Sequence, residues 1–272
     1  MSAYQPILYT FRETPDVLLA HAQAMSAGDE AARVDRKRNA TGCVVCVFVI
    51  AVAVPLSVLV PLLALVGIPV VLAALVVMGV SASRYMKARR QDLDDRKVKA
   101  FLTLSAVLRA DVPASEVVQV DLDLRPYKET PPLETSADRR ARYAQEWLSA
   151  EAPLQDGSRA WLELTDRVVR KESPKRKYTK VTERMHSVAR VTLRLARAHG
   201  EAAQASARLA TQPAPARLVL AGVEARGRTV RATFRTPEAM RTTRHTADPE
   251  PTLGDAHTLL RGLRWVYRSL AP

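Results

Sequence analysis

Basic side chains crowd one short segment of this sequence. Residues 167–184 hold eight lysine and arginine side chains against two glutamates. Such a concentration of charge creates a strong positive potential, which attracts anionic surfaces. The eight candidate residues for binding an anionic surface are Arg167, Arg170, Lys171, Lys175, Arg176, Lys177, Lys180 and Arg184. The alternative is a solvated edge whose charges only prevent strand aggregation.

Side chains that could support catalysis are scattered along the chain. The histidines, His21, His186, His199, His245 and His257, lie far apart in the sequence. The sequence has no glycine-rich phosphate loop, no HExxH and no GxSxG motif, which are the usual signatures of catalytic chemistry. We therefore expect no catalytic residue, no cofactor and no metal, and a non-enzymatic function. An enzyme whose site is assembled from residues distant in sequence stays the alternative.

Two pairs of side chains have spacings that ligand pairs also use. Asp121 and Asp123 share one face of an expected strand and could bind a cation. We expect them instead to neutralise arginines such as Arg125. Cys43 and Cys46 lie in an apolar stretch, where free cysteine usually packs as a small hydrophobic residue. The chain has no other cysteine, so a reducing compartment is compatible.

A long apolar stretch is the strongest pattern in the sequence. No charged residue lies between Arg38 and Arg84. One membrane-spanning helix needs about 20 apolar residues, so this stretch predicts two helices. The prolines and serine of residues 54–61 mark the break. We therefore predict spans at about 43–59 and 63–82, in a hairpin domain over 42–83; the alternative is a hairpin buried in a soluble core.

The charged flanks of this hairpin predict its orientation. Positive flanks favour the cytoplasmic side, and two spans place both flanks on one side. The flanking residues are Arg33, Arg36, Lys37, Arg38, Arg84, Lys87, Arg89 and Arg90. We expect a multi-pass protein of a bacterial inner membrane, because the composition is rich in alanine and arginine, with both termini in the cytoplasm. No cleavable secretory signal is visible.

This placement favours one partner for the basic segment. The net charge is +13, and its excess follows the hairpin. A basic residue close to an anionic bilayer gains about 1 kcal/mol. A nucleic acid is the rival, but Tyr178 is the only aromatic residue near the cluster, whereas binders of RNA or single strands use several. We expect a lipid bilayer with anionic headgroups, or an unidentified protein, as the partner.

Helical patterns are expected on both sides of the hairpin. In the N-terminal segment, 1–41, Thr14 is the expected cap and Gly28 the expected end of a short amphipathic helix. Its apolar stripe comprises Leu18, Leu19, Ala22 and Met25. This stripe would pack on the main domain or lie on the membrane surface. Residues 84–112 predict a stalk helix that ends before Pro113.

The remaining residues, 113–272, predict an antiparallel β-domain. Apolar and polar side chains alternate from Val118 to Leu124, which is typical of a half-buried strand. Hairpin turns are expected at Asp156-Gly157, at 173–176 and at Arg226-Gly227. A C-terminal helix is expected at 254–270. The predicted class is a membrane-anchored α+β protein with about six strands in a sandwich or barrel-like domain.

Several of these elements occur together in a known group of proteins. The strand ending at Asp121 to Arg125, Trp147, the turn at Asp156-Gly157 and the basic region from Arg167 to Arg184 stand in this order. The arrangement resembles uncharacterised bacterial membrane proteins with an N-terminal transmembrane hairpin, over about 85–200. The element order more distantly resembles bacterial pleckstrin-homology-like membrane proteins. Neither resemblance implies a known activity.

Overall fold

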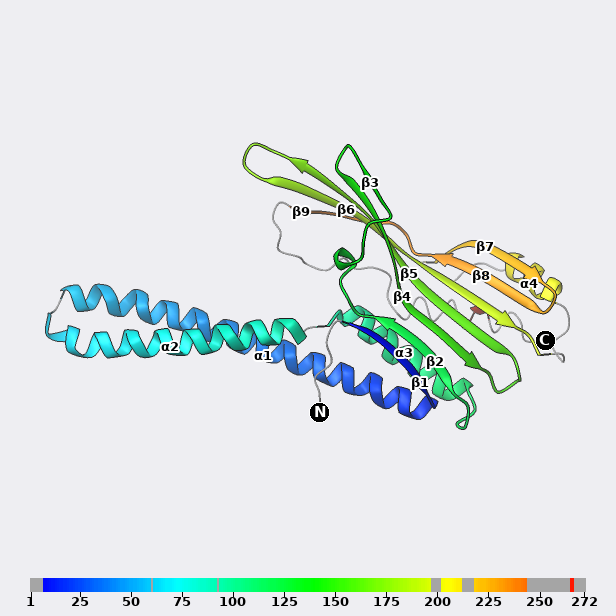
Figure 1. The fold of residues 1–272 in the computed structure, drawn as a ribbon, viewed down its shortest axis with the longest axis horizontal. Helices are drawn as coiled ribbons and strands as arrows, with labels where there is room; N and C mark the ends of the chain where they lie inside the picture. Colours follow the sequence, from blue (N-terminus) through cyan, green and yellow to red (C-terminus); the bar gives the residue numbers. More distant parts are fainter. Residues whose placement is uncertain are drawn as a thin grey trace. The chain divides into compact units, whose positions relative to one another are not determined.

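The computed structural model describes residues 7–59, 61–91, 93–196, 202–211, 218–243 and 265–266 (Figure 1). The chain divides into two compact units. One contains residues 24–93, and the other contains residues 7–23 together with the chain from residue 94 onward. A segment that precedes the apolar stretch therefore belongs to the same unit as the sheet.

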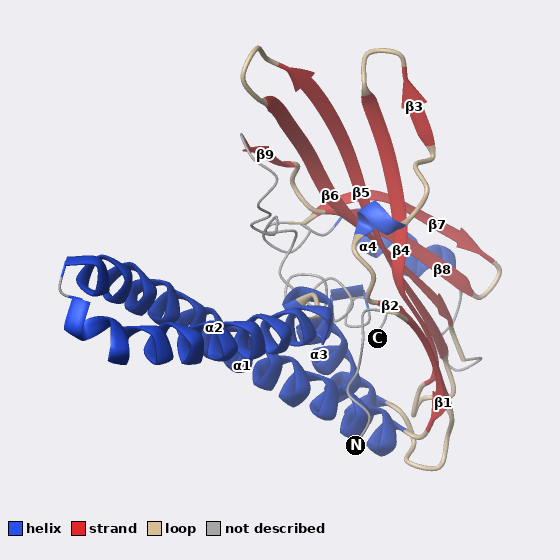
Figure 2. Ribbon diagram, turned by 60° about the vertical axis from the view of Figure 1, so that its left-hand side comes forward, coloured by secondary structure: helices blue, strands red, loops and turns tan. Residues whose placement is uncertain are grey.

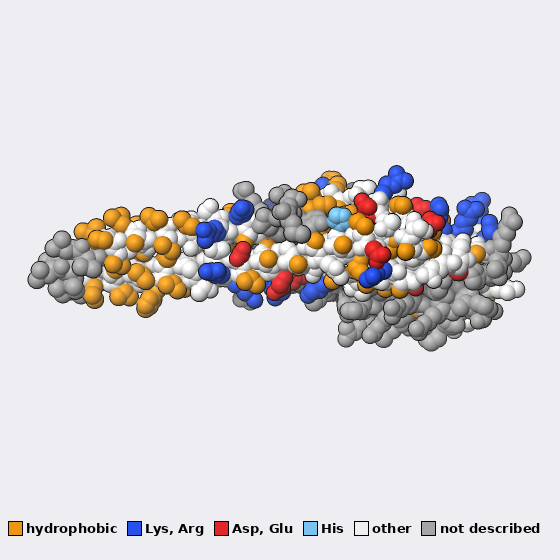
Figure 3. Space-filling model, turned by 90° about the horizontal axis from the view of Figure 1, so that it is seen from below, with side chains coloured by type: hydrophobic (Ala, Val, Ile, Leu, Met, Phe, Trp, Pro, Cys, Tyr) orange, Lys and Arg blue, Asp and Glu red, His pale blue; other side chains and the backbone are white. Residues whose placement is uncertain are grey.

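Two long apolar helices form the first unit, as predicted. Helix α1 covers Pro15–Leu59 and helix α2 covers Pro61–Gln91, so the chain breaks inside the expected segment. Both helices are long and apolar enough to cross a membrane. Figure 3 shows hydrophobic side chains over much of their surface, with lysine and arginine gathered where the apolar part ends.

Close contacts hold the two helices together. A Cβ atom added to Gly42 on α1 would lie 3.2 Å from Ser81 Oγ on α2. Just past the end of α2, the Leu93 backbone N–H donates a hydrogen bond to the buried Asp29 carboxylate of α1 at 2.8 Å. Cys46 is buried and Cys43 is partly buried, consistent with a packing role.

The prediction that a helix ends at Gly28 was wrong. Helix α1 continues through this position for 45 residues. A glycine inside a helix costs only about 1 kcal/mol relative to alanine, and the alanine-rich, charged sequence that follows favours the helix. Three residues of the predicted apolar stripe, Leu18, Ala22 and Met25, are fully buried, whereas Leu19 is only partly buried. At the start of the helix, His21 contacts the Phe11 ring, with centroids 5.2 Å apart.

The prediction of a continuous stalk over 84–112 was also wrong. A separate helix, α3, covers Asp95–Asp111. Its N-cap is Asp94, whose side chain accepts hydrogen bonds from the backbone N–H groups of Arg96 and Lys97. This cap satisfies donors that a helix start leaves unpaired. The buried side of α3 includes Phe101, which stacks on Phe11 of the sheet at 5.5 Å. The helix is therefore packed on the sheet.

The second unit is built on a nine-stranded antiparallel sheet (Figure 2). Its main order is β1-β2-β4-β5-β6-β8-β7, with β3 paired to β4 and β9 to β6. The strands are β1 (Leu8–Glu13), β2 (Val118–Asp123), β3 (Glu134–Ser136), β4 (Arg140–Pro153), β5 (Arg159–Pro174), β6 (Thr179–Arg194), β7 (Val219–Arg226), β8 (Thr229–Arg235) and β9 (Ala239–Thr243). The described strands thus form one open sheet, which ends at β1 and β7.

The alternating strands and the turns at Asp156-Gly157 and Arg226-Gly227 are confirmed, whereas the turn expected at 173–176 lies at 175–178, because β5 continues to Pro174. Gly157 and Gly227 have φ angles of +80° and +58°, which the β4–β5 and β7–β8 turns require and glycine adopts without strain. Val118, Val120 and Leu122 are fully buried, as their alternation predicts. The sheet has more strands than the six expected. The additional strands β1, β3 and β9 are short and carry no clear alternation, so the sequence pattern did not predict them.

Three short segments complete the described structure. A 3₁₀ turn covers Tyr127–Glu129, and helix α4 covers Ala202–Thr211. The C-terminal helix expected at 254–270 lies outside the described residues except for Trp265 and Val266. These two residues are helical. Trp265 contacts the Phe234 ring of β8 at 5.7 Å, and Val266 is buried.

Candidate functional site

The structure brings four of the eight predicted basic residues together on one face of the β5–β6 hairpin. Residues that oppose one another in an antiparallel pair project from the same face. Arg167 opposes His186, Lys171 opposes Thr182, Lys180 opposes Ser173 and Arg184 opposes Val169. The core residues Val168 and Met185 project from the other face. We call Arg167, Lys171, Lys180 and Arg184 the basic face.

The other four basic residues lie elsewhere on the hairpin. Lys175, Arg176 and Lys177 are exposed in the turn between the two strands, where the Lys175 N–H donates to the Tyr178 carbonyl at 2.8 Å. Arg170 projects from the face opposite the basic face. The turn therefore adds to the positive surface and Arg170 does not.

Both glutamates of the segment also lie opposite the basic face. The Glu172 carboxylate accepts a hydrogen bond from Arg170 at 2.7 Å. Glu183 is buried and accepts a hydrogen bond from the Tyr127 hydroxyl. Within the described part of the chain, no side chain of the basic face forms an ion pair. The folded hairpin therefore separates charges that are mixed in the sequence.

Further along the same side of the sheet, two arginines are paired with carboxylates. Arg190 lies 2.6 Å from the Glu163 carboxylate, and Arg159 lies 3.1 Å from that of Glu151. Such exposed pairs contribute little stability, but they cancel local charge. The basic face and the adjoining turn thus keep a positive charge that these two pairs have lost.

His186 provides a local measure of this potential. Burial and then the neighbouring Arg167 guanidinium lower the pKa of His186 below its usual value, with Arg235 contributing further; the Glu238 and Asp166 carboxylates act in the opposite direction but are outweighed. A positive neighbour disfavours the charged imidazolium. The histidine therefore becomes charged only in more acidic solution than an ordinary histidine.

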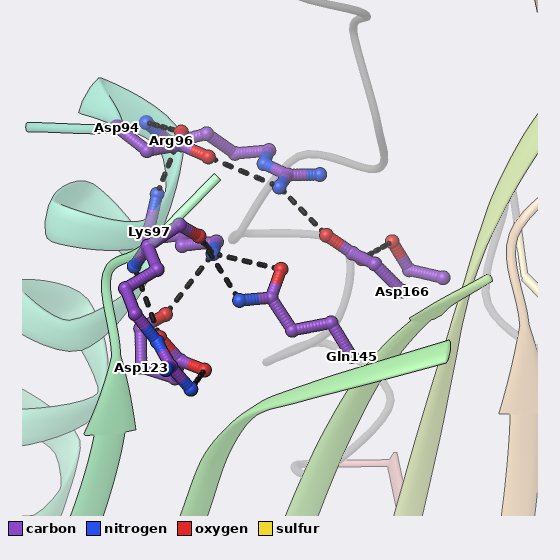
Figure 4. Close-up of polar contacts among 8 residues, drawn as sticks. Asp94, Arg96, Lys97, Asp123, Gln145 and Asp166 are labelled. Atoms are coloured by element: carbon purple, nitrogen blue, oxygen red, sulfur yellow. Dashed lines mark hydrogen bonds and ion pairs between the residues drawn. The ribbon is translucent and has the colours of Figure 1, made fainter. Parts of the chain in front are cut away.

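A buried polar network, which the sequence did not reveal, joins α3 to the sheet (Figure 4). Lys97 is only 2% exposed. Its ammonium donates to the Asp123 and Arg125 carbonyls at 3.0 and 2.7 Å and to Gln145 Oε1 at 3.3 Å. These acceptors use all three donors of the group. Burial lowers the pKa of Lys97.

An ion pair lies beside this ammonium. The Arg96 guanidinium donates to the Asp166 carboxylate on β5 at 2.7 Å, while the other Asp166 oxygen accepts from the Ser187 hydroxyl on β6 at 2.6 Å. Arg96 also reaches Asp94 at 3.2 Å and lies over the Trp147 ring. Burial alone would lower the pKa of Arg96, but Asp166 and Asp94 keep it above the ordinary value.

The expected neutralisation of Asp123 by Arg125 is present. The Arg125 guanidinium donates to both Asp123 oxygens, at 3.0 and 2.9 Å. Burial would raise the pKa of Asp123, but hydrogen bonds from Arg125 hold it below the usual value. Asp121 instead accepts a hydrogen bond from the Thr10 hydroxyl of β1 at 2.7 Å. The two carboxylates thus have separate protein partners.

This network positions elements and has no visible reacting centre. Its cations and carboxylates are engaged by protein groups, which suits a fixed contact between α3 and the sheet. Among the described residues, no three histidine, cysteine, aspartate or glutamate side chains are grouped to hold a metal. One sequence signal marks the network: Asp166 stands where the alternation Leu162, Leu164, Val168 requires an apolar residue.

A second polar cluster lies on the core side of the β5–β6 hairpin. Tyr127 donates to Glu183 and makes an edge contact with the Tyr143 ring, with centroids 5.2 Å apart. Burial and then the hydrogen bond to Glu183 raise the pKa of Tyr127. The Arg170 Nε atom is buried without a hydrogen-bond partner. Arg170 and Glu183, which oppose one another across β5 and β6, thus lie in this cluster on the side opposite the basic face.

Comparison with known proteins identifies no relative. No family model matches the chain, and no curated protein or solved structure matches it significantly. The basic face and the buried network are therefore the features from which a function is inferred.

Proposed function

We propose that this chain is a membrane-anchored, non-enzymatic module whose basic face binds anionic lipid headgroups. Helices α1 and α2 form the anchor in this proposal, in a bacterial inner membrane. The proposal retains the resemblance to bacterial membrane proteins with a transmembrane hairpin and a basic β-rich domain. An unidentified protein with an acidic surface is the alternative partner.

One observation carries the proposal. The basic face presents four cationic side chains without a paired carboxylate among the described residues, while both glutamates of the segment face the other way. Three more cations follow in the turn. Each basic residue near an anionic bilayer contributes about 1 kcal/mol, so these residues together favour lipid binding substantially.

The binding test uses the full chain, because β1 precedes the α1–α2 hairpin and a fragment that starts after this hairpin, at residue 84, lacks the strand. The protein is inserted into nanodiscs of phosphatidylcholine and mixed with sedimentable vesicles at low salt. We expect co-sedimentation with vesicles containing phosphatidylglycerol and none with pure phosphatidylcholine. Salt should weaken the binding, since ions screen exposed charges.

A matched pair of variants tests the surface. The double variant Arg167→Gln and Arg184→Gln removes two unpaired charges and should weaken vesicle binding by about thirtyfold. The control, Arg159→Gln and Arg190→Gln, removes two charges that are already paired with carboxylates. Equal losses for both variants, or equal binding to neutral vesicles, would contradict a specific basic face.

A binding measurement with nucleic acids tests the rival hypothesis of a nucleic-acid tether. Short duplex DNA and single-stranded RNA replace the vesicles at the same salt concentration. Tighter binding to either, with a steep dependence on salt, would favour a nucleic-acid tether.

The proposed orientation has its own test. Reporter fusions are placed at each terminus and between α1 and α2. Basic residues flank the apolar stretch on both sides, so both termini should report the cytoplasm and the inter-helix position the opposite side. Termini on opposite sides would exclude the two-span arrangement.

A further inference from the structure

A second positive site lies on the same side of the sheet, near the β7–β8 turn. An open hollow of about 600 Å³ is formed there by residues of β5, β6, β8 and the turn. Small-molecule sites commonly have volumes of about 300–1,000 Å³. The hollow is separate from the basic face, because none of its lining residues belongs to residues 167–184.

The strand register assembles the hollow from three neighbouring strands. Trp161 on β5 opposes Thr192 on β6, which opposes Arg231 on β8. In the next row, Arg194 opposes Thr229. Adjacent strands lie about 5 Å apart, so these groups surround a space that one small ligand can occupy.

Positive charge dominates the lining. The arginines Arg194, Arg228 and Arg231 stand against one carboxylate, Glu163. Glu163 is engaged by Arg190 at 2.6 Å, and Arg231 lies 3.5 Å from the largely exposed Glu224. Within the described residues, Arg194 and Arg228 form no ion pair. Two guanidinium groups are thus available to an anion.

The backbone holds one of these arginines at the rim. The Leu195 N–H, just past the end of β6, donates to the Arg228 carbonyl at 2.8 Å. Gly227 supplies the positive φ angle that the turn requires. The turn is therefore tied to β6 beside Arg194.

We propose that this hollow binds a phosphomonoester group. Guanidinium groups match the geometry of phosphate oxygens and bind them through paired hydrogen bonds. The hydroxyls of Thr192 and Thr229 add donors, and the Trp161 ring offers an apolar wall to the organic part of a ligand. The phosphate is carried either by a free small molecule or by a lipid headgroup.

The test measures binding to the full chain in phosphatidylcholine nanodiscs by calorimetry, with empty nanodiscs as the blank. The probes are inorganic phosphate and water-soluble dihexanoyl phosphatidic acid. We expect saturable binding with one ligand per chain. Similar affinities would assign the site to the phosphate group itself, and much tighter binding of the lipid would assign it to a headgroup. Absence of saturable binding for both probes overturns the proposal.

Variants locate the binding. Arg194→Gln with Arg228→Gln should weaken it at least about tenfold, and both side chains are exposed, so folding should persist. Arg235→Gln is the matched control, because Arg235 lies on the same strand and side as Arg231 but outside the hollow. Equal losses from Arg235→Gln and the double variant would overturn the proposal. Arg167→Gln with Arg184→Gln should leave phosphate binding intact, which separates this site from the basic face.

Discussion

Arg96, in the first turn of α3, donates to the Asp166 carboxylate of β5 across 2.7 Å, and Asp166 is only 3% exposed. Through this contact, a residue five positions after the end of α2 is joined to a central strand of the sheet. The pair therefore fixes the start of α3, which is the first element of the sheet unit after the α1–α2 hairpin.

The first prediction concerns this pair. Asp166→Ala should lower the free energy of unfolding of the sheet unit by about 3 kcal/mol, because it leaves the Ser187 hydroxyl without its acceptor and Arg96 with Asp94 as its remaining carboxylate partner. Glu151→Ala breaks an exposed pair and should cost less than about 1 kcal/mol. Urea unfolding of the full chain in nanodiscs, followed by tryptophan fluorescence, measures both. Similar losses would contradict a structural role for the buried pair.

The second prediction is a pH dependence that arises from Asp123. Its pKa is below the ordinary value of 3.8 in the folded protein, so the folded state binds fewer protons than the unfolded state. This stabilisation is complete above pH 3.8 and is lost as the pH falls through the folded pKa. Asp123→Asn should therefore be less stable near neutral pH and lose less stability on acidification. Urea unfolding at a series of pH values measures the free energy of unfolding of both proteins. The same dependence of this free energy on pH in both would contradict the prediction.

The third prediction uses His186 as a probe of the basic face. Its pKa should lie below 6.5 in the folded protein, because burial and Arg167 disfavour the charged imidazole. Arg167→Gln should raise this pKa, while Arg159→Gln on β5 should not change it measurably. Nuclear magnetic resonance titration of histidine-labelled protein measures the values. An unchanged pKa in Arg167→Gln would show that Arg167 does not contribute to the lowered value.

The fourth prediction concerns the packing of the apolar helices. Gly42→Val should destabilise the α1–α2 pair by about 1–3 kcal/mol, because its side chain would meet Ser81. Gly79→Val on α2 is the control, since a Cβ atom there meets nothing within 4 Å. Thermal unfolding in one detergent compares the variants. Equal shifts in melting temperature for the two variants would indicate that the β-branched valine in the helix, and not the contact with Ser81, causes the loss of stability.

Local patterns in the sequence determined much of the architecture. The uncharged stretch after Arg38 is too long for one helix, and its two helices follow from length and composition alone. Alternation from Val118 to Leu124 and the glycines of two tight turns determined strands and hairpins. These features depend on neighbouring residues, so they are readable without knowledge of the rest of the fold.

Tertiary structure alone decided which charges act together. Whether Arg170, Glu172 and Glu183 face the same side as Arg167 depends on the strand register, which is set by core packing and turn geometry. The pairing of β1 with β2 joins residues more than one hundred positions apart, and no local pattern encodes it. The burial of Lys97 on α3 likewise depends on the carbonyl groups of Asp123 and Arg125, at and just beyond the end of β2. Sequence determined where charge is abundant, and long-range packing decided where it remains uncompensated.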